Sequence, residues 1–285
     1  MVTVTGLINL PSTVAKMKTA FNLILISCLA VCRGQSMRYS TAMPYAGQGA
    51  YSSRHIDVFS FTANQAALCK LEKFSAGIFT ERRFLLAATG FHSAAVAIPT
   101  RLGNIGLAFN YGGFKNFSEH KVGIAYARRL GSQAELGIQF DQYGYRVPGY
   151  GNASAITAEL GLTLQLTAQL HAGIHVFNPQ SARLSGSDER LSAAYKLGFG
   201  FDVSESFFTG IEVIKEEDKP VDVLASMQYQ FMKKLFARAG FLSASSTAFF
   251  GAGVRFSSFR CDLSASFHPQ LGISPGLLII FFASQ

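Results

Sequence analysis

The feature that most constrains this chain is a period-two alternation of apolar and polar residues, which begins at Lys73 and continues to the C-terminus. From Ile156 to Leu166 the even positions are all apolar, and the odd positions read Thr, Glu, Gly, Thr and Gln. Because successive side chains of a β-strand point to opposite faces, each such run predicts a strand with one apolar face. The fourteen runs lie at about 73–80, 90–99, 103–113, 118–130, 134–147, 153–166, 168–177, 190–203, 206–216, 220–231, 234–243, 247–256, 259–267 and 275–283.

Two architectures produce this pattern, namely a secreted sandwich of two sheets and a barrel that crosses a membrane. Many runs exceed the roughly 5–6 residues of a sandwich strand and reach the length that crosses a bilayer at a tilt. Charged residues make up only 15% of the chain, against about 25% in soluble domains, and the polar faces are dominated by Gly, Ala, Ser and Thr. Aromatic residues gather at the ends of the runs, as in the interfacial girdles of membrane barrels. We therefore expect an all-β fold, a 14-stranded antiparallel transmembrane β-barrel in the lipid of a bacterial outer membrane.

The connections between the runs support an up-and-down barrel. Short turns such as 130–133 alternate with longer, more polar connections, of which 178–189 is the longest. A barrel with two unlike ends produces this alternation, and an even number of strands returns the chain to the side on which it started. The apolar face of each run is then expected to contact acyl chains, and the polar face to line the lumen.

The N-terminal part of the chain predicts a leader and a plug. A basic start at Met17-Lys18 precedes a short apolar segment and small residues, which indicates a signal peptide over 1–34 with an upstream extension at 1–16. Residues 35–72 lack a sustained period and are expected to form a periplasmic or plug segment ahead of the barrel at 73–285. Within it, the stretch 63–71 predicts a short helix that Thr62 or Asn64 could cap.

The charged residues expected to face the lumen carry both signs. They are Glu212, Asp222 and Arg260 together with eight residues that we assign to a polar network, namely Glu135, Asp141, Glu159, Lys196, Asp202, Arg238, Arg255 and Asp262. We interpret them as a network of ion pairs and hydrogen bonds around the plug, with a selective permeation path as the alternative. Inside a plugged barrel Glu159 needs a partner, for which Lys196 or an arginine is the candidate.

No pattern in the sequence predicts an enzyme. His171 and His175 stand four apart on one strand face, about 13 Å at the usual rise per residue, so they cannot share a metal ion. The chain has no G-x-S-x-G motif, P-loop or dinucleotide fingerprint, and we expect no catalytic residue, metal or cofactor. Cys69 and Cys261, the cysteines left after cleavage, have no metal-ligand spacing and are interpreted as small apolar side chains, with a disulfide between them left open. The net charge of +8 comes from scattered Lys and Arg residues, which argues against nucleic acid as a partner.

The order of these features resembles a known family. The leader, Asp57-Val58-Phe59-Ser60, the segment 64–68 and the fourteen runs together resemble the PorV/PorQ branch of the FadL-like outer-membrane barrels of Bacteroidetes. The resemblance implies that the N-terminal helix folds into the lumen as a plug carrying an Asn-Pro-Ala-type motif. Asn64, Gln65 and Ala66 stand at that motif, with Gln65 where proline is usual.

The resemblance also implies two functions. PorV/PorQ-like members would bind other outer-membrane or envelope proteins as part of a type IX-like secretion apparatus. FadL-like members would instead take up hydrophobic small molecules through a lateral gap at a kink in the third strand. Gly112 and Gly113 stand at the end of the third run, where paired glycines weaken strand pairing; the alternative is that they begin a flexible outer loop.

Overall fold

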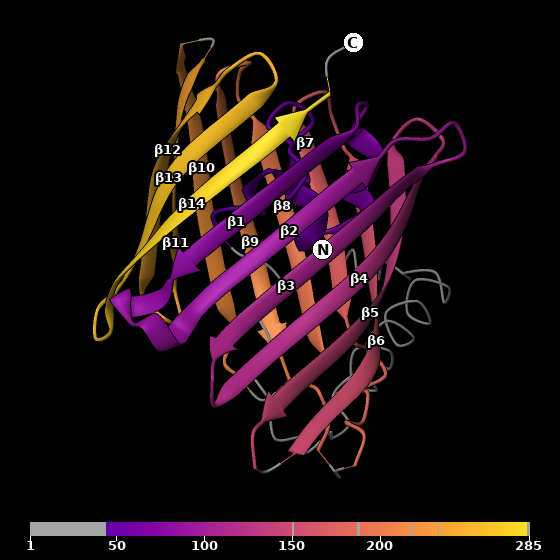
Figure 1. The fold of residues 1–285 in the computed structure, drawn as a ribbon. Coiled ribbons are helices and arrows are strands. Elements are labelled where there is room, and N and C mark those ends of the chain that lie inside the picture. Colours follow the sequence, from indigo (N-terminus) through magenta and orange to yellow (C-terminus); the bar gives the residue numbers. More distant parts are fainter. Residues whose placement is uncertain (1–43, 150, 187–188, 218, 233, 284–285) are drawn as a thin grey trace, which may run out of the picture. The chain divides into compact units, whose positions relative to one another are not determined.

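A computed structural model describes residues 44–149, 151–186, 189–217, 219–232 and 234–283. Within this part of the chain fourteen strands close into one antiparallel barrel, in which each strand pairs with its sequence neighbours and β1 pairs with β14 (Figure 1). The strands are β1 (Ser75–Arg82), β2 (Gly90–Ile98), β3 (Asn104–Phe114), β4 (Phe117–Leu130), β5 (Ala134–Val147), β6 (Gly151–Gln165), β7 (Leu170–Phe177), β8 (Ala194–Asp202), β9 (Phe207–Glu216), β10 (Asp222–Met232), β11 (Leu235–Leu242), β12 (Thr247–Arg255), β13 (Phe259–His268) and β14 (Gly272–Phe282). Closure leaves no sheet edge facing lipid. The predicted fold class is confirmed, and no predicted run differs from its strand by more than four residues at either end.

The two ends of the barrel carry different connections. One end, which we call the turn end, holds the connections after the even-numbered strands, such as 131–133 and 256–258. The other end, the loop end, holds those after the odd-numbered strands, including 178–193 between β7 and β8. Bacterial barrels place short turns in the periplasm and longer loops outside, so the loop end faces the exterior and β14 ends on the periplasmic side.

The two faces of each strand differ as the alternation predicts. On β6, Ile156 is 72% exposed and faces outward, whereas Glu159 is fully buried and faces the lumen. The same division holds on β8, where Leu197 and Phe199 are exposed and the residues between them are buried. The apolar outer band is therefore the surface that contacts lipid acyl chains.

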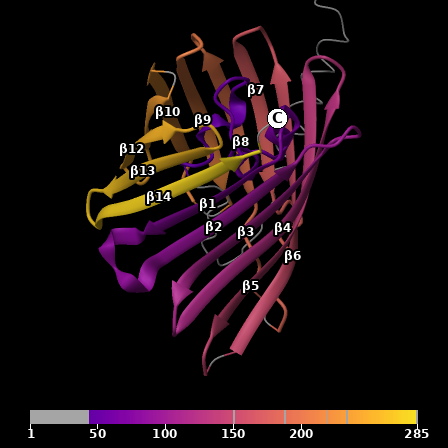
Figure 2. The ribbon, with the colours of Figure 1, turned by 45° about the horizontal axis from the view of Figure 1, so that its top comes forward.

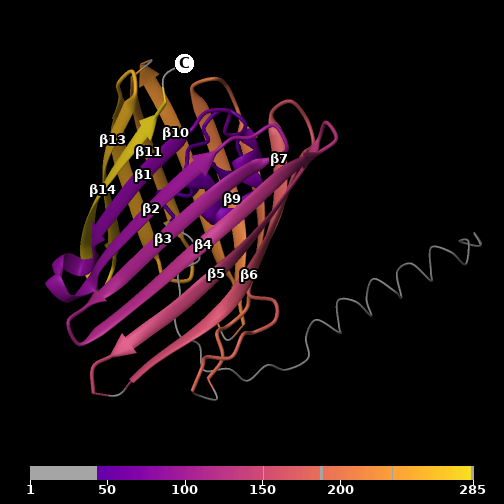
Figure 3. The ribbon, with the colours of Figure 1, turned by 45° about the vertical axis from the view of Figure 1, so that its right-hand side comes forward.

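The described part of the N-terminal segment lies inside the barrel and forms a plug over residues 44–72. It contains the short helices η1 (Gln48–Tyr51), α2 (Ser60–Ala63) and η2 (Gln65–Lys70), and Figures 2 and 3 show this indigo segment within the ring of strands. Two further short helices, η3 (Arg83–Leu85) and η4 (Ala87–Thr89), lie between β1 and β2. Among the described residues, no helix is long and apolar enough to cross a membrane.

The plug fits because the strands it touches present glycine. A Cβ atom on Gly161 of β6 would lie 2.2 Å from Asn64 Oδ1 of the plug, and one on Gly200 of β8 would lie 2.1 Å from the backbone oxygen of Tyr51. Real Cβ atoms do not approach other atoms so closely. The inward glycines, which weaken a strand elsewhere, here leave room for the plug backbone to lie against the barrel wall.

The N-terminal part departs from the single helix that the sequence predicts. The helix expected over 63–71 is divided, because Asn64 adopts an extended conformation between α2 and η2. The side chain of Asn64 caps η2 by accepting a hydrogen bond from the backbone N–H of Ala66. The expected signal peptide lies outside the described residues.

Candidate functional site

An ion-pair cluster fastens the start of the plug to β11 and β13. The Asp57 carboxylate accepts hydrogen bonds from Arg238 and Arg260, each at 2.8 Å. Arg260 also donates to both oxygens of Asp262, at 2.8 and 2.5 Å, and the Tyr45 hydroxyl donates to Asp262 at 3.2 Å. All five residues are buried. Two carboxylates thus neutralise two guanidinium groups, which is the condition for holding charges out of water.

Asp57 stays ionised in this cluster. Burial by itself raises the pKa of this carboxyl, but the charges of Arg238 and Arg260 outweigh burial and hold the pKa below its ordinary value. The backbone N–H of Phe59 donates to the same carboxylate at 2.9 Å, which further favours the charged form. Asp57 therefore both anchors the plug and orders the turn that leads into α2.

A second cluster lies against η2. The Glu159 carboxylate on β6 accepts hydrogen bonds from Lys121 at 2.6 Å and from Gln65 of the plug at 2.5 Å. The Nε2 atom of His175 lies 2.9 Å from the same carboxylate. Asp141 completes the cluster, 3.6 Å from the Lys121 amine. Gln65 thus gives the plug a direct polar contact with the wall at the position where the resemblance places proline.

A third cluster holds the segment after η1. The Asp202 carboxylate at the end of β8 accepts hydrogen bonds from the Ser52 hydroxyl at 2.5 Å and from the backbone and hydroxyl of Ser53, both at 2.9 Å. One strand away, Tyr51 donates to Glu212 at 3.0 Å, and Lys196 lies 3.7 Å from the same carboxylate. The plug is therefore tied to the barrel wall at three places, by buried polar contacts each time.

An open cavity of about 710 Å³ lies between the plug and the loop end. Its walls come from the inner faces of β8, β9 and β10, and its rim from the connections β1–β2, β9–β10, β11–β12 and β13–β14. We call it the outer cavity. Its larger aliphatic and phenylalanine lining residues are Phe84, Phe208, Ile211, Ile214, Leu224, Leu242 and Leu271.

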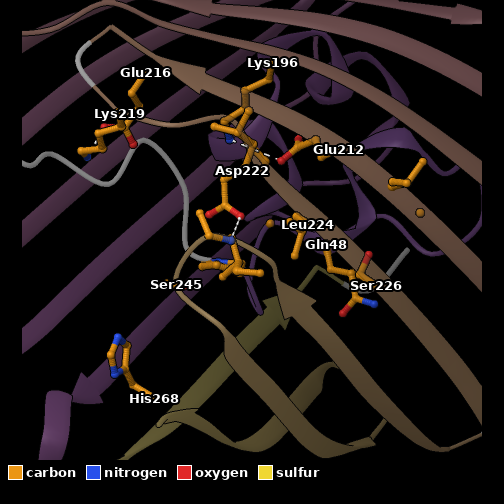
Figure 4. Close-up of a pocket in the computed structure, with 18 of the residues that line it drawn as sticks. Gln48, Lys196, Glu212, Glu216, Lys219, Asp222, Leu224, Ser226, Ser245 and His268 are labelled. Atoms are coloured by element: carbon orange, nitrogen blue, oxygen red, sulfur yellow. Dashed lines mark hydrogen bonds and ion pairs between the residues drawn. The ribbon is translucent and has the colours of Figure 1, made fainter. Parts of the chain in front are cut away.

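Positive and negative side chains line the outer cavity in equal number, and they are Arg83, Lys196 and Lys219 against Glu212, Glu216 and Asp222. Figure 4 shows Lys196 beside Glu212, and Lys219 beside Glu216 at the rim. Asp222 accepts hydrogen bonds from Ser243 and from the backbone of Ala244 in the β11–β12 connection. Arg83 lies 3.5 Å from Glu81, which is outside the lining. The lining is therefore mixed: its positive and negative charges balance and have partners, and apolar side chains lie among them.

The structure distributes the eight predicted network residues among several places. Asp141 and Glu159 lie in the second cluster, Arg238 and Asp262 in the first, Asp202 in the third, and Lys196 lines the outer cavity. Glu135 lies 3.5 Å from Lys70 at the end of η2. Arg255 lies over the ring of Phe282, 5.3 Å from its centroid, and belongs to none of the described ion pairs.

The expected partner of Glu159 was wrong. Its partner is Lys121 on β4, two strands away, whereas Lys196 pairs with Glu212. The alternation of β4 places Lys121 on the same face as Gly123, and this signal could have identified it. Asp57 was missed for a different reason, since no period marks the irregular segment that carries it.

The third strand pairs with β4 from Asn104 to Phe114 and with β2 from Ile105 to Gly112. Gly112 pairs with Phe91 on one side and Glu119 on the other, and Gly113 pairs with Ser118. Gly113 adopts a positive φ of 116°, which suits glycine, but the register of β3 continues without a shift to Phe114. Up to Gly112 the strand is therefore paired on both sides, whereas Gly113 and Phe114 pair with β4 alone, and a lateral gap at these glycines stays a prediction.

The described part of the chain contains neither a candidate metal-binding cluster nor a disulfide. It contains no group of three or more His, Cys, Asp or Glu side chains that could hold a metal ion. Cys69 and Cys261 are both free. Burial and the nearby charge of Glu135 raise the pKa of the Cys69 thiol to about 12, so this thiol is unreactive as a nucleophile.

Comparisons with known proteins agree with the fold. No family model and no curated protein matches the sequence. Among solved structures, the toluene transporter TodX of Pseudomonas putida has a TM-score of 0.62 at 11% identity, over 88% of this chain and 99% of that one. The monoaromatic hydrocarbon channel CymD has a TM-score of 0.60 at 13% identity, over 87% of this chain and 95% of that one. A FadL homologue of Pseudomonas aeruginosa has a TM-score of 0.58 at 12% identity, over 87% of this chain and 99% of that one. At such identities the likeness establishes the fold alone, which is the closed β-barrel that these outer-membrane channels share.

Proposed function

We propose that this protein is an outer-membrane channel that takes up small hydrophobic molecules, which it first binds in the outer cavity. The observation that carries the proposal is the cavity itself, about 710 Å³ between the plug and the exterior. Ligand pockets have volumes of roughly 300–1,000 Å³ and are mostly apolar with a few polar groups. The similar folds named as a toluene transporter and a hydrocarbon channel support the same class of ligand.

The lining of the cavity favours a molecule without a net charge. Phe208, Leu224 and Leu242 supply apolar surface on the wall, while Lys196 and Glu212 neutralise each other. A charged ligand would have to leave water for a surface whose own charges are already satisfied, which is unfavourable. An uncharged apolar molecule gains from leaving water without this cost.

Passage beyond the cavity through the lumen requires the plug to move, because residues 44–72 lie inside the barrel (Figure 2). Gln48 and Tyr51 of the plug contribute to the lining of the cavity. A molecule bound there therefore touches the element that blocks its path, and binding could shift the plug between two positions.

Filling the cavity tests this proposal. We expect Leu224→Trp, in full-length protein reconstituted in liposomes, to lower uptake of radiolabelled toluene at least fivefold. Leu224 is buried in the wall of the cavity, so the indole would occupy the binding space. The matched control is Leu263→Trp, because Leu263 is 69% exposed on the outer face of β13 and the indole there would contact lipid.

Folding of both variants is verified by their shift in mobility on heating in detergent gels. Reduced uptake by the Leu224 variant with normal uptake by the Leu263 variant supports the channel. If the folded Leu224→Trp protein takes up toluene at the wild-type rate, or if the wild type takes up none, the proposal is wrong.

A PorV/PorQ-like role in binding envelope partners for type IX-like secretion is the second candidate. The feature that favours it is the tightly held plug, since a partner-binding barrel needs no open path. It predicts that the protein, extracted from native outer membranes in mild detergent, co-purifies with a reproducible partner. A monomer without partners in every extraction would argue against it.

A further inference from the structure

A second, much smaller pocket lies at the opposite, turn end of the barrel. It has a volume of about 30 Å³ and is lined by plug residues together with the ends of β10, β11, β12 and β13. Its charged and ionisable lining residues are Arg54, His55, Lys234, Arg255 and Arg260, and no carboxylate is among them. We call it the turn-end pocket.

Three of these positive charges have no carboxylate partner within the described residues. Arg260 is matched by Asp57 and Asp262. The ion pairs found in the described part of the chain do not include Arg54, Lys234 or Arg255. All three side chains are exposed at the mouth of the pocket. Converging cations with no carboxylate attract an anion from solution.

The floor of the pocket holds a buried donor without an acceptor. Arg238 donates to Gln228 Oε1 at 2.7 Å, which fixes the orientation of this amide because a guanidinium has no acceptor. The amide nitrogen of Gln228 then donates to His55 Nδ1 at 2.9 Å. In the neutral imidazole the proton must therefore lie on Nε2, and this buried atom has no hydrogen-bond partner in the described residues.

His55 is neutral at ordinary pH. Burial lowers the pKa of the imidazole, and the charges of Arg238 and Arg54 lower it further, against the opposing effects of the Asp202 charge and of the Ser204 backbone. His55 is 6% exposed, so water does not readily satisfy its Nε2–H group. Buried polar groups in native proteins almost always have a partner, and the pocket beside His55 is where one would lie.

We propose that the turn-end pocket binds the carboxylate of a small periplasmic anion. The carboxylate would accept hydrogen bonds from His55 Nε2 at the floor and from Arg54 or Arg255 at the mouth. Arginine and carboxylate pair well because the guanidinium offers two parallel donors to two oxygens. The small volume admits a group the size of one or two water molecules, which suits a carboxylate and is too small for a whole hydrophobic ligand. The site thus differs from the outer cavity in both place and chemistry.

Titration of the full chain with ¹³C-labelled formate, in a nonionic detergent at constant ionic strength, tests the proposal by NMR line broadening. We expect saturable broadening by the wild type and at least fivefold weaker binding by Arg54→Gln and by Arg255→Gln. His55→Phe should weaken binding without any change of charge. Arg101→Gln is the matched control, since Arg101 is an exposed residue between β2 and β3 at the same end and belongs to none of the described ion pairs.

The outcomes distinguish specific binding at the turn-end pocket from nonspecific attraction by the net positive charge of the turn end. Binding that is lost in the Arg54 and Arg255 variants and kept in the Arg101 variant supports the site. Equal weakening by Arg101→Gln would show that only the net charge of the turn end matters. The proposal is also wrong if the wild type shows no saturable binding, or if phosphate binds at the pocket and formate does not. Because none of these measurements involves hydrophobic ligands, their failure is distinguishable from failure of the channel proposal.

Discussion

Replacement of Asp57 by Asn should release the plug from the barrel wall. The variant keeps the size of the side chain and removes its charge, so Arg238 and Arg260 lose the carboxylate oxygen to which both donate at 2.8 Å. The amide can use its oxygen for the backbone N–H of Phe59, which leaves its NH₂ group facing two guanidinium donors. Two charge-assisted hydrogen bonds are then lost in a buried place.

The magnitude follows from these contacts. A hydrogen bond to a charged group contributes about 1.5–3 kcal/mol, and breaking a buried ion pair by removing one partner costs about 3–5 kcal/mol. Asp262 still neutralises part of the remaining charge, so we expect the free energy of plug opening to fall by about 3 kcal/mol, the lower end of that range. At roughly 1.4 kcal/mol for each factor of ten, the plug would open about a hundredfold more often.

Hydrogen–deuterium exchange of peptides covering residues 57–71 measures this opening directly. Exchange in the plug should accelerate about a hundredfold in Asp57→Asn, while exchange in the strands stays unchanged. The control is Asp222→Asn, whose carboxylate accepts hydrogen bonds from Ser243 and Ala244 at the loop end and does not contact the plug. If plug exchange in Asp57→Asn equals that of the control, the reasoning from the ion-pair cluster is refuted.

The same exchange measurement has a pH dependence with a definite sign. Because the folded-state pKa of Asp57 is lower than its ordinary value, the carboxylate stabilises the docked plug fully above the ordinary pKa of about 3.9. This contribution is lost as the pH falls below that value toward the lower folded-state pKa. Wild-type plug exchange, corrected for the intrinsic rate, should therefore be constant near neutral pH and accelerate only in strong acid. The Asp57→Asn variant should accelerate less, because only the other carboxylates that hold the plug, such as those of Glu159, Asp202 and Asp262, then remain to be protonated.

Two further predictions test the barrel wall. Leu162→Arg, on the outer face of β6, should lower the free energy of barrel unfolding in lipid by about 2–4 kcal/mol. Leu166→Arg, on the same face just beyond the turn end of β6 and 49% exposed, should cost only about 0–1 kcal/mol; equal effects of the two, measured by urea titration, would contradict the assigned facing of Leu162. Gly161→Ala places a Cβ atom 2.2 Å from Asn64 Oδ1 and should destabilise plug docking by about 1–3 kcal/mol, seen as faster exchange in the plug. Gly90→Ala is its control, because the nearest atom to the new Cβ lies 3.5 Å away, and plug exchange unchanged in Gly161→Ala would show that the contact relaxes without cost.

The strands could be predicted because their signal is local. A period of two follows from the geometry of one extended chain, so the run that contains Ile156 and Glu159 identifies both a strand and its two faces without reference to any other residue. Low charge and strand length then distinguish a lipid-facing barrel from a soluble sandwich. The same alternation gives the inward set of polar residues, since facing depends only on position along the strand.

The partners of those inward residues could not be predicted in this way. Glu159 meets Lys121 across 38 positions, and Asp57 meets Arg238 and Arg260 across 181 and 203 positions. Such contacts depend on the register of strand pairing and on how deeply the plug enters the lumen, neither of which leaves a local period. The outer cavity and the turn-end pocket are likewise spaces between the plug and the wall. The sequence alone therefore determined the strands, their facing and the membrane setting, whereas the ion pairs and both pockets were decided only when the closed barrel brought distant segments together.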